Sequence, residues 1–231
     1  MTETILFVPG LNCTGEVFAP QVAALSAVWP CVVADHSRGA TIPEIAGFIL
    51  ERAPERFALA GFSLGGYIAF EIIRQSPGRV TRLALLDTQA TPESDAARQR
   101  RLELLVMVQE GRFAEAEQAH WPDVVHPSRY GDVALRETKE RMARDTGPDL
   151  WRRHVAAIMA RADSRPTLAA IKVPTLVLVG DADRLTPPER ARDMVAGIAD
   201  ARLVVIPECG HMAPIERPDA VNAALVDWIR A

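Results

Sequence analysis

Lysine is nearly absent from this 231-residue sequence, which contains only Lys139 and Lys172. Chemistry that needs an amine nucleophile therefore has two candidates, and neither lies in a motif. The chain also has no strong charge of either sign, with 26 basic and 30 acidic residues and a formal charge of −4. Aromatic residues make up 6%. Without a positive field or many rings for base stacking, we expect no nucleic-acid partner.

Cysteine and long apolar runs are scarce as well. Cys13, Cys31 and Cys209 are an odd number with no CxxC spacing, which argues against a disulfide framework or a zinc site. Residues 1–10 have no basic leader, and their apolar run is too short for a signal core or a membrane span. We expect a cytoplasmic protein without metal, cofactor or membrane partner; these features do not fix its oligomeric state.

Short apolar runs rich in β-branched residues alternate with helix-length segments. Because the runs are continuously apolar, they are typical of strands buried on both faces of a parallel sheet. The alternation indicates right-handed crossovers. We predict an α/β fold with an open, mainly parallel sheet of about six strands flanked by helices. The predicted strands are residues 4–8, 31–34, 57–60, 80–86, 175–179 and 202–206. Helices are expected over 17–28 and 187–199, the latter with Thr186 as its N-cap.

The alternation is interrupted between residues 92 and 165, where only helical patterns occur. We predict that residues 92–165 form a helical cap inserted between the fourth and fifth strands, and that 1–91 and 166–231 form the core. A separate helical domain is the alternative. Apolar residues at helical spacing form two stripes, Leu102, Leu105, Val106 and Val108 in one and Trp151, Val155, Ile158 and Met159 in the other.

A serine between glycines gives the strongest chemical signal. The segment GFSLGG, residues 61–66, follows a predicted strand and precedes a helical stretch. In this context G-x-S-x-G forms a tight turn that exposes the serine, and the neighbouring glycines leave room for the crowded backbone. The turn also places Ser63 near a helix N-terminus, which favours a developing negative charge. We interpret Ser63 as a nucleophile.

A serine hydroxyl needs a base, and five histidines are available. His211 lies in a loop just after the last predicted strand, so it shares the carboxyl edge of the sheet with Ser63. We predict that His211 is the general base. His36 follows the second strand and stays an alternative, whereas His120, His126 and His154 lie in the predicted cap.

Two carboxylates could orient the base. Asp183 lies in the loop after the fifth strand, and Asp87 ends the fourth. Both reach the same edge, and both give the chain order Ser, Asp, His that is found in α/β hydrolases. Order therefore leaves both open.

An oxyanion hole needs two backbone N–H groups. Leu64 follows the nucleophile, and Leu11 lies in the loop after the first strand, beside Gly10. If the second and third strands flank the first, the strand order reverses beside this loop, and ligand crevices form at such points. Cys13 is a rival nucleophile in the same loop, without an equally coherent arrangement of base and helix.

With these residues in place, the chain resembles the α/β-hydrolase family over nearly its whole length. The segments GFSLGG, GDADRLTPP and CGHMAPIERPDAV are similar to the three signature segments of its small esterase-like members. The resemblance implies that the acid is the last Asp of the G-x-x-D loop, which is Asp183. Two features depart from the family: Pro9-Gly10 replaces a common His-Gly, and the N-terminal antiparallel hairpin is missing.

We therefore predict a serine hydrolase that cleaves carboxylic esters of small to medium size through an acyl-enzyme. Thioester hydrolysis, cleavage of C–C bonds in diketone-like compounds and cofactor-free perhydrolysis use the same triad, and fold alone does not separate them. A hydrolase-like small-molecule binding protein and a helical interaction module are alternatives of other classes. The residues expected to line the substrate pocket are Asn12, Trp121, Leu185 and Met212.

Overall fold

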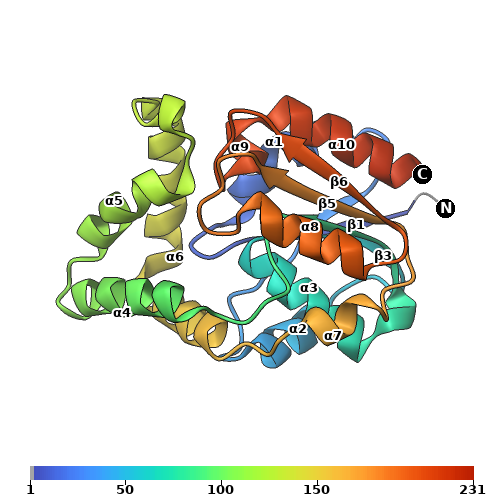
Figure 1. The fold of residues 1–231 in the computed structure, drawn as a ribbon, viewed down its shortest axis with the longest axis horizontal. Coiled ribbons are helices and arrows are strands. Elements are labelled where there is room, and N and C mark those ends of the chain that lie inside the picture. Colours follow the sequence, from blue (N-terminus) through green and yellow to red (C-terminus); the bar gives the residue numbers. More distant parts are fainter. Residues whose placement is uncertain (1–2) are drawn as a thin grey trace.

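The structure, a computed structural model, describes residues 3–231. The first two residues of the predicted core range 1–91 lie outside it. Within residues 3–231 one six-stranded sheet has the order β2-β1-β3-β4-β5-β6, and every neighbouring pair is parallel (Figure 1). Its strands are β1 (Ile5–Val8), β2 (Cys31–Val33), β3 (Phe57–Phe62), β4 (Val80–Leu86), β5 (Thr175–Gly180) and β6 (Ala201–Ile206).

The predicted strands are confirmed. β1 lies between β2 and β3, which is the condition stated above for a reversal of strand order beside the Leu11 loop. The strand ends differ by one or two residues from the prediction. β3 continues to Phe62 because Gly61 and Phe62 pair with Leu85 and Leu86 of β4. β1, β3 and β5 are buried along their whole length, as their apolar runs indicate.

Helices cover both faces of the sheet (Figure 1). One face packs against α2 (Ile42–Leu50), α3 (Leu64–Gln75) and α8 (Pro188–Gly197). The other packs against α1 (Ala19–Leu25), α9 (Ala213–Glu216) and α10 (Pro218–Arg230). Each layer forms its own hydrophobic cluster with the side chains that point to that face, so the core consists of two apolar layers with the sheet between them.

Two helix predictions need correction. Residues Gly15–Phe18 form a 3₁₀ helix, with Thr14 accepting from the Glu16 amide, so α1 begins only at Ala19. Thr186 does not cap α8, whose N-cap is Pro187. The Thr186 hydroxyl instead donates to Asp183 Oδ2 at 2.6 Å. The sequence predicted a helix boundary at Thr186, but a nearby buried carboxylate binds its hydroxyl.

Four α-helices follow β4 before the chain returns at β5: α4 (Asp95–Gln109), α5 (Phe113–Val124), α6 (Val133–Met159) and α7 (Arg165–Leu168). No strand lies in this described stretch of the chain. We call α4, α5 and α6 the inserted helices. They lie beyond the edge toward which the arrowheads of β5 and β6 point (Figure 1). The division into a core and a cap remains a prediction.

The inserted helices share a small apolar cluster of their own. It contains Trp151 and Val155 of α6, from the second predicted stripe. From α4 it takes Leu104 and Val108, one turn apart. Of the first predicted stripe, Val108 is buried in this cluster and Leu105 packs against it. Leu102 and Val106 were predicted wrongly, because they are 40% and 52% exposed and lie on the opposite side of α4. Across residues 3–231, every helix is too short or too polar to cross a bilayer.

Candidate active site

Ser63 lies in a strained turn between β3 and α3. Its φ of 52° and ψ of −114° are unusual for a residue with a side chain. The turn is locked on both sides, because the Ser63 N–H donates to the Leu86 carbonyl at 2.9 Å and the Thr88 hydroxyl donates to the Ser63 carbonyl at 2.9 Å. A Cβ at Gly65 would overlap the Val8 carbonyl. Close backbone packing thus explains the glycine of the motif and projects the Ser63 side chain from the sheet edge.

His211 and Asp183 meet Ser63 in one line of hydrogen-bonding groups. His211 Nε2 lies 2.8 Å from Ser63 Oγ, and His211 Nδ1 lies 2.8 Å from Asp183 Oδ2. The His211 and Asp183 side chains are almost fully buried. With a proton on Nδ1 held by the carboxylate, Nε2 is free to accept the proton of the serine hydroxyl. The structure therefore brings together the three residues that were predicted as nucleophile, base and acid.

The Asp183 carboxylate is held by its own loop. Oδ1 accepts from the amides of Leu185 and Thr186 at 2.9 and 3.0 Å, and Oδ2 accepts from the Thr186 hydroxyl. Burial by itself raises the pKa of Asp183, but the charge of His211 and the hydrogen bonds from His211 and Thr186 outweigh it and lower this pKa below its usual value. Asp183 is thus kept ionised and fixed in orientation beside the imidazole.

Asp87, the alternative acid, occupies a different environment. It is fully buried, and its Oδ1 accepts from the Gly180 amide at 3.0 Å, while Oδ2 has no hydrogen-bond partner within residues 3–231. Burial first, and then the charge of Asp183, raise the pKa of Asp87 well above its usual value. The carboxylate beside His211 is therefore Asp183 rather than Asp87.

The predicted oxyanion donors lie in the serine turn and in the loop that packs against it. Leu64 N–H is the first amide of α3, and neither it nor Leu11 N–H donates to another group in the described chain. The loop that carries Leu11 packs directly against the serine turn, since a Cβ at Gly10 would lie 2.9 Å from the Phe62 ring and 3.3 Å from Ser63 Cβ. Two free amides near a nucleophile can stabilise an oxyanion.

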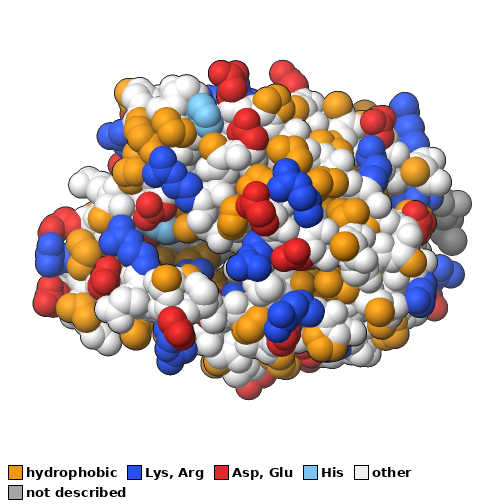
Figure 2. Space-filling model, in the orientation of Figure 1, with side chains coloured by type: hydrophobic (Ala, Val, Ile, Leu, Met, Phe, Trp, Pro, Cys, Tyr) orange, Lys and Arg blue, Asp and Glu red, His pale blue; other side chains and the backbone are white. Residues whose placement is uncertain are grey.

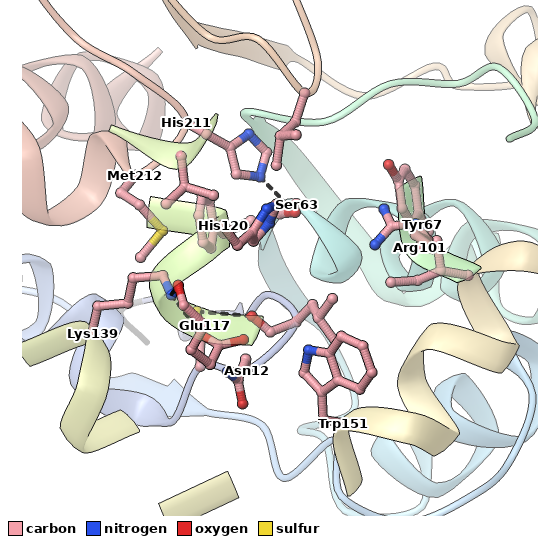
Figure 3. A pocket seen from close by; sticks show the side chains of 16 residues that line it. Asn12, Ser63, Tyr67, Arg101, Glu117, His120, Lys139, Trp151, His211 and Met212 are labelled. Carbon is pink, nitrogen blue, oxygen red and sulfur yellow. Dashed lines mark hydrogen bonds and ion pairs between the residues drawn. The ribbon is translucent and has the colours of Figure 1, made fainter. Parts of the chain in front are cut away.

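A cavity opens in front of Ser63, between the sheet edge and the inserted helices (Figure 3). Figure 2 shows the surface hollowed where the inserted helices meet the rest of the chain. Three of the four predicted pocket residues line this cavity: Asn12, Leu185 and Met212. The nucleophile thus faces a partly open cavity that is bounded by residues from both parts of the chain.

Trp121, the fourth predicted pocket residue, is not among the described residues that line the cavity. It is buried elsewhere, and its indole N–H donates to the Tyr130 carbonyl at 3.2 Å. His120 lines the cavity. Successive side chains of a helix are about 100° apart around its axis, so the Trp121 ring on α5 points away from the cavity. Trp151 of α6 lines the cavity instead. The sequence singled out Trp151 only as part of an apolar stripe.

Polar residues of the inserted helices also line the cavity, and the sequence predicted no role for them there. Lys139 Nζ of α6 lies 2.5 Å from Glu117 Oε2 of α5, and both side chains are about nine-tenths buried. His120 lies on the same face of α5 as Glu117. Burial lowers the pKa of His120. These residues are distant in sequence and share no motif; the one available signal was that lysine is rare in this chain.

The alternative base and nucleophile lie apart from this line of groups. His36 Nε2 donates to the Gly10 carbonyl at 3.1 Å. Cys13 lines the cavity, but its thiol donates to the Leu11 carbonyl at 3.4 Å, and burial raises its pKa to about 12. A thiol in this environment stays protonated at neutral pH and is a poor nucleophile. No cluster of three metal-binding side chains occurs among residues 3–231.

Comparison with known proteins places this chain among hydrolases. The model described as "Alpha/beta hydrolase family" matches residues 5–224. A relative named "Putative carbamate hydrolase RutD", from Rhizobium rhizogenes, is 28% identical over 253 residues, which cover 99% of this chain and 93% of the relative. The 2-hydroxy-6-oxo-6-phenylhexa-2,4-dienoate hydrolase of Comamonas testosteroni is 28% identical and covers 86% of this chain and 72% of its own length.

The fold also resembles solved structures over the whole chain. A thermophilic esterase from Thermogutta terrifontis superposes with a TM-score of 0.89 and 26% identity, covering 100% of this chain and 90% of the esterase. The enol-lactonase from Burkholderia xenovorans LB400 superposes with a TM-score of 0.89 and 25% identity, covering 100% and 92%. Relatives that share this fold therefore act on chemically different substrates.

Proposed function

Because this chain belongs to the alpha/beta hydrolase family and is a hydrolase, we propose that it is a serine hydrolase that cleaves carboxylic esters of small to medium size. The observation that carries this proposal is the line of 2.8 Å contacts from Ser63 Oγ through His211 to Asp183. Each group has the partner that the chemistry needs: a nucleophile beside a base, and a base held by a carboxylate.

The reaction follows from the positions of these groups. His211 Nε2 accepts the hydroxyl proton as Ser63 Oγ attacks the ester carbonyl carbon, and the imidazolium is stabilised by Asp183. The amides of Leu11 and Leu64 donate to the oxyanion. His211 then gives the proton to the leaving alcohol, and the acyl group remains on Ser63. Water, deprotonated by His211, attacks this acyl-enzyme and releases the acid.

The inserted helices define which substrates fit. We include in this proposal that residues 92–165 act as a cap over Ser63, since Trp151, Glu117 and Lys139 face the cavity from that segment. The substrate is a small molecule, and the protein acts in the cytoplasm without a metal or an organic cofactor. Thioesters, diketone-like compounds and perhydrolysis remain within reach of the same triad, and the carbamate hydrolase relative adds carbamates to this group.

Labelling with an organophosphonate tests the proposal. Mass spectrometry of the labelled protein should find one adduct, on Ser63, because only an activated serine reacts readily with such a reagent. Ser63→Ala should take up no label, and Cys13→Ser should be labelled like the unchanged protein. An adduct on Cys13, or labelling that persists in Ser63→Ala, would contradict the proposal.

A substrate screen then separates the reaction types. Matched esters, thioesters, carbamates and diketones with the same acyl chain should show the highest kcat/KM for the ester. Multiple turnovers of any of them distinguish a hydrolase from a binding protein, which would stop after capture of one ligand.

A further inference from the structure

Two guanidinium groups share one carboxylate beside the cavity. Glu93 Oε1 accepts from Arg101 Nε at 2.9 Å, and Glu93 Oε2 contacts Arg161 Nη1. The Glu93 and Arg161 side chains are 5% and 4% exposed, whereas that of Arg101 is 20% exposed. One negative charge thus faces two positive charges, and Arg161 alone is enough to neutralise Glu93.

The surplus charge is located at the cavity in front of Ser63. Arg101 lines that cavity, and Figure 3 shows it beside Tyr67, across the cavity from Lys139. Only Nε of Arg101 is used by Glu93, and its two terminal nitrogens make no hydrogen bond to the part of the chain that the structure describes. A guanidinium with two free nitrogens presents a planar fork that fits a carboxylate.

The other charged residues of the cavity leave this surplus in place. Lys139 is paired with Glu117 at 2.5 Å, so these two charges cancel. Burial lowers the pKa of His120, which keeps this imidazole neutral at neutral pH. Of the charged groups among residues 3–231 that face the cavity, Arg101 is therefore the one without a full counter-charge.

We propose that the substrate carries an anionic group, such as a carboxylate, that binds the two terminal nitrogens of Arg101 while its ester carbonyl lies at Ser63. This proposal rests on the proposed function and narrows it to half-esters of dicarboxylic acids and esters of similar charge.

A matched pair of esters tests this inference. Monomethyl glutarate and methyl valerate have acyl chains of the same length, and they differ in a terminal carboxylate or methyl group. The ratio of their kcat/KM values should favour the charged ester. In Arg101→Gln this ratio should fall by about 10- to 100-fold, because a charge-assisted contact is lost. Arg101→Lys should give an intermediate ratio, since it keeps the charge but loses the fork.

Arg100→Gln is the matched control. Arg100 is the preceding residue of α4, and its charge is paired with Glu103 and Asp123 at the surface, so the ratio should stay at its original value. An unchanged ratio in both Arg101→Gln and Arg101→Lys would overturn the anion site while ester hydrolysis stands. If the protein turned over neither of these esters and no other acyl substrate, the proposed function itself would be overturned. Melting temperatures verify folding, which Arg161 should preserve by keeping Glu93 paired.

A separate observation concerns the loop that carries Leu11. The Gly10 carbonyl accepts from His36 Nε2 at 3.1 Å and, within its own loop, from the Cys13 N–H at 3.3 Å; it belongs to the same peptide unit as the Leu11 N–H. The peptide bonds in the described chain are trans, and a trans peptide is planar. Its C=O and N–H therefore point in opposite directions, so a partner that fixes the carbonyl also fixes the direction of the Leu11 amide.

His36 is itself held in one orientation. It is buried, and its ring stacks on His154 of α6 with ring centroids 4.9 Å apart. His154 Nε2 in turn donates to the His36 carbonyl at 2.9 Å. Burial and the neighbouring His154 lower the pKa of His36 to about 4, so its imidazole is neutral at neutral pH and donates from Nε2. The geometry assigns His36 as a positioning residue for the Leu11 N–H.

Two variants of His36 separate positioning from packing. His36→Phe keeps a ring but has no N–H donor, so kcat should fall by about 10- to 100-fold with little change in KM. This loss is smaller than the loss in kcat expected when an oxyanion donor is itself removed. His36→Gln retains an N–H donor and should recover most of this loss. Affinity for a boronic acid, which binds as a tetrahedral anion, should fall in parallel with kcat.

All rates are expressed per active site titrated with organophosphonate, so that unfolded protein does not count. An undiminished kcat in His36→Phe would overturn this assignment. Equal losses in both variants together with lowered melting temperatures would show instead that His36 only packs against His154.

Discussion

The two walls of the cavity are held in place by different means. On the sheet side, backbone packing leaves no freedom: a Cβ at Gly65 would overlap the Val8 carbonyl, and one at Gly180 would overlap the Gly210 carbonyl. In the inserted segment, a Cβ at Gly131, in the turn before α6, would meet open space. The sheet wall is thus determined by close backbone contacts, and the turn at Gly131 has no such contacts. Catalytic geometry needs the first kind of support, and substrate selection can use the second.

The polar contacts of the two walls differ in the same way. Asp183 is held by backbone amides of its own loop, within three residues in sequence. Lys139 and Glu117 are held by each other, across two helices and 22 residues of sequence. A motif can encode the first arrangement, because it depends on local backbone. The second depends on how the helices pack.

Loss of Ser63 should have the largest effect on turnover and should distinguish the roles of the two walls most clearly. Ser63→Ala should lower esterase kcat by about 10⁴- to 10⁶-fold while leaving the fold intact, because the triad acts as a unit. Steady-state kinetics and circular dichroism measure the two properties. Near-normal turnover in folded Ser63→Ala would show that the sheet wall does not carry the chemistry.

Asp183→Asn should follow, with a loss of about 10³- to 10⁴-fold in kcat, because an amide beside Nδ1 favours the wrong imidazole tautomer. Asp87→Asn should cost less than about tenfold, since Asp87 bonds to the Gly180 amide and not to His211. Parallel kcat measurements on the two purified variants make the comparison. A larger loss in Asp87→Asn would overturn the choice of Asp183.

The sequence predicted most of the fold and the proximity of Ser63, Asp183 and His211. These predictions succeeded where short stretches of sequence determine the structure. The apolar runs define the strands, and the loop segments around Ser63, Asp183 and His211 place these residues at one sheet edge. That they are catalytic stays a prediction. Thr186 illustrates the limit: its position suggested a helix cap, but a tertiary contact with Asp183 determines its role.

The inserted wall was predicted poorly because helical periodicity gives a repeat but not the direction in which each face points. Trp121 and Trp151 both lie in helices, and both are buried, yet only Trp151 lines the cavity. Similarly, Leu104 rather than Leu102 packs inward in α4. These outcomes depend on how helices pack against each other, which a single sequence does not contain.

The two tryptophans sharpen the contrast within the inserted wall. Trp121→Ala should lower the free energy of unfolding by about 3 kcal/mol, because it removes a buried ring, and it should leave the order of substrate preference unchanged. Trp151→Ala should also destabilise, but it should shift preference toward bulkier acyl groups. Denaturant unfolding and kcat/KM over an acyl series test both. Altered preference in Trp121→Ala alone would reverse the assignment.

The smallest change in turnover is expected at Asp87, whose Oδ2 has no hydrogen-bond partner among residues 3–231. The pKa of Asp87 is raised in the folded state, first by burial, whereas in the unfolded chain it lies near about 3.9. The folded protein therefore binds more protons, and the stability that Asp87 contributes falls as pH rises above about 4 toward its folded pKa.

Asparagine cannot ionise and resembles the protonated carboxyl group in shape. The free energy of unfolding of Asp87→Asn should therefore differ least from that of the unchanged protein near pH 4. As pH rises to 8, the variant should become increasingly more stable relative to the unchanged protein, as measured by urea unfolding at each pH. Asp200→Asn, at an exposed position, corrects for the loss of one negative charge. A stability difference that stays constant from pH 4 to 8 would mean that Asp87 is ionised in the folded state. The sheet wall would then contain two buried like charges, Asp87 and Asp183, an arrangement that burial makes costly.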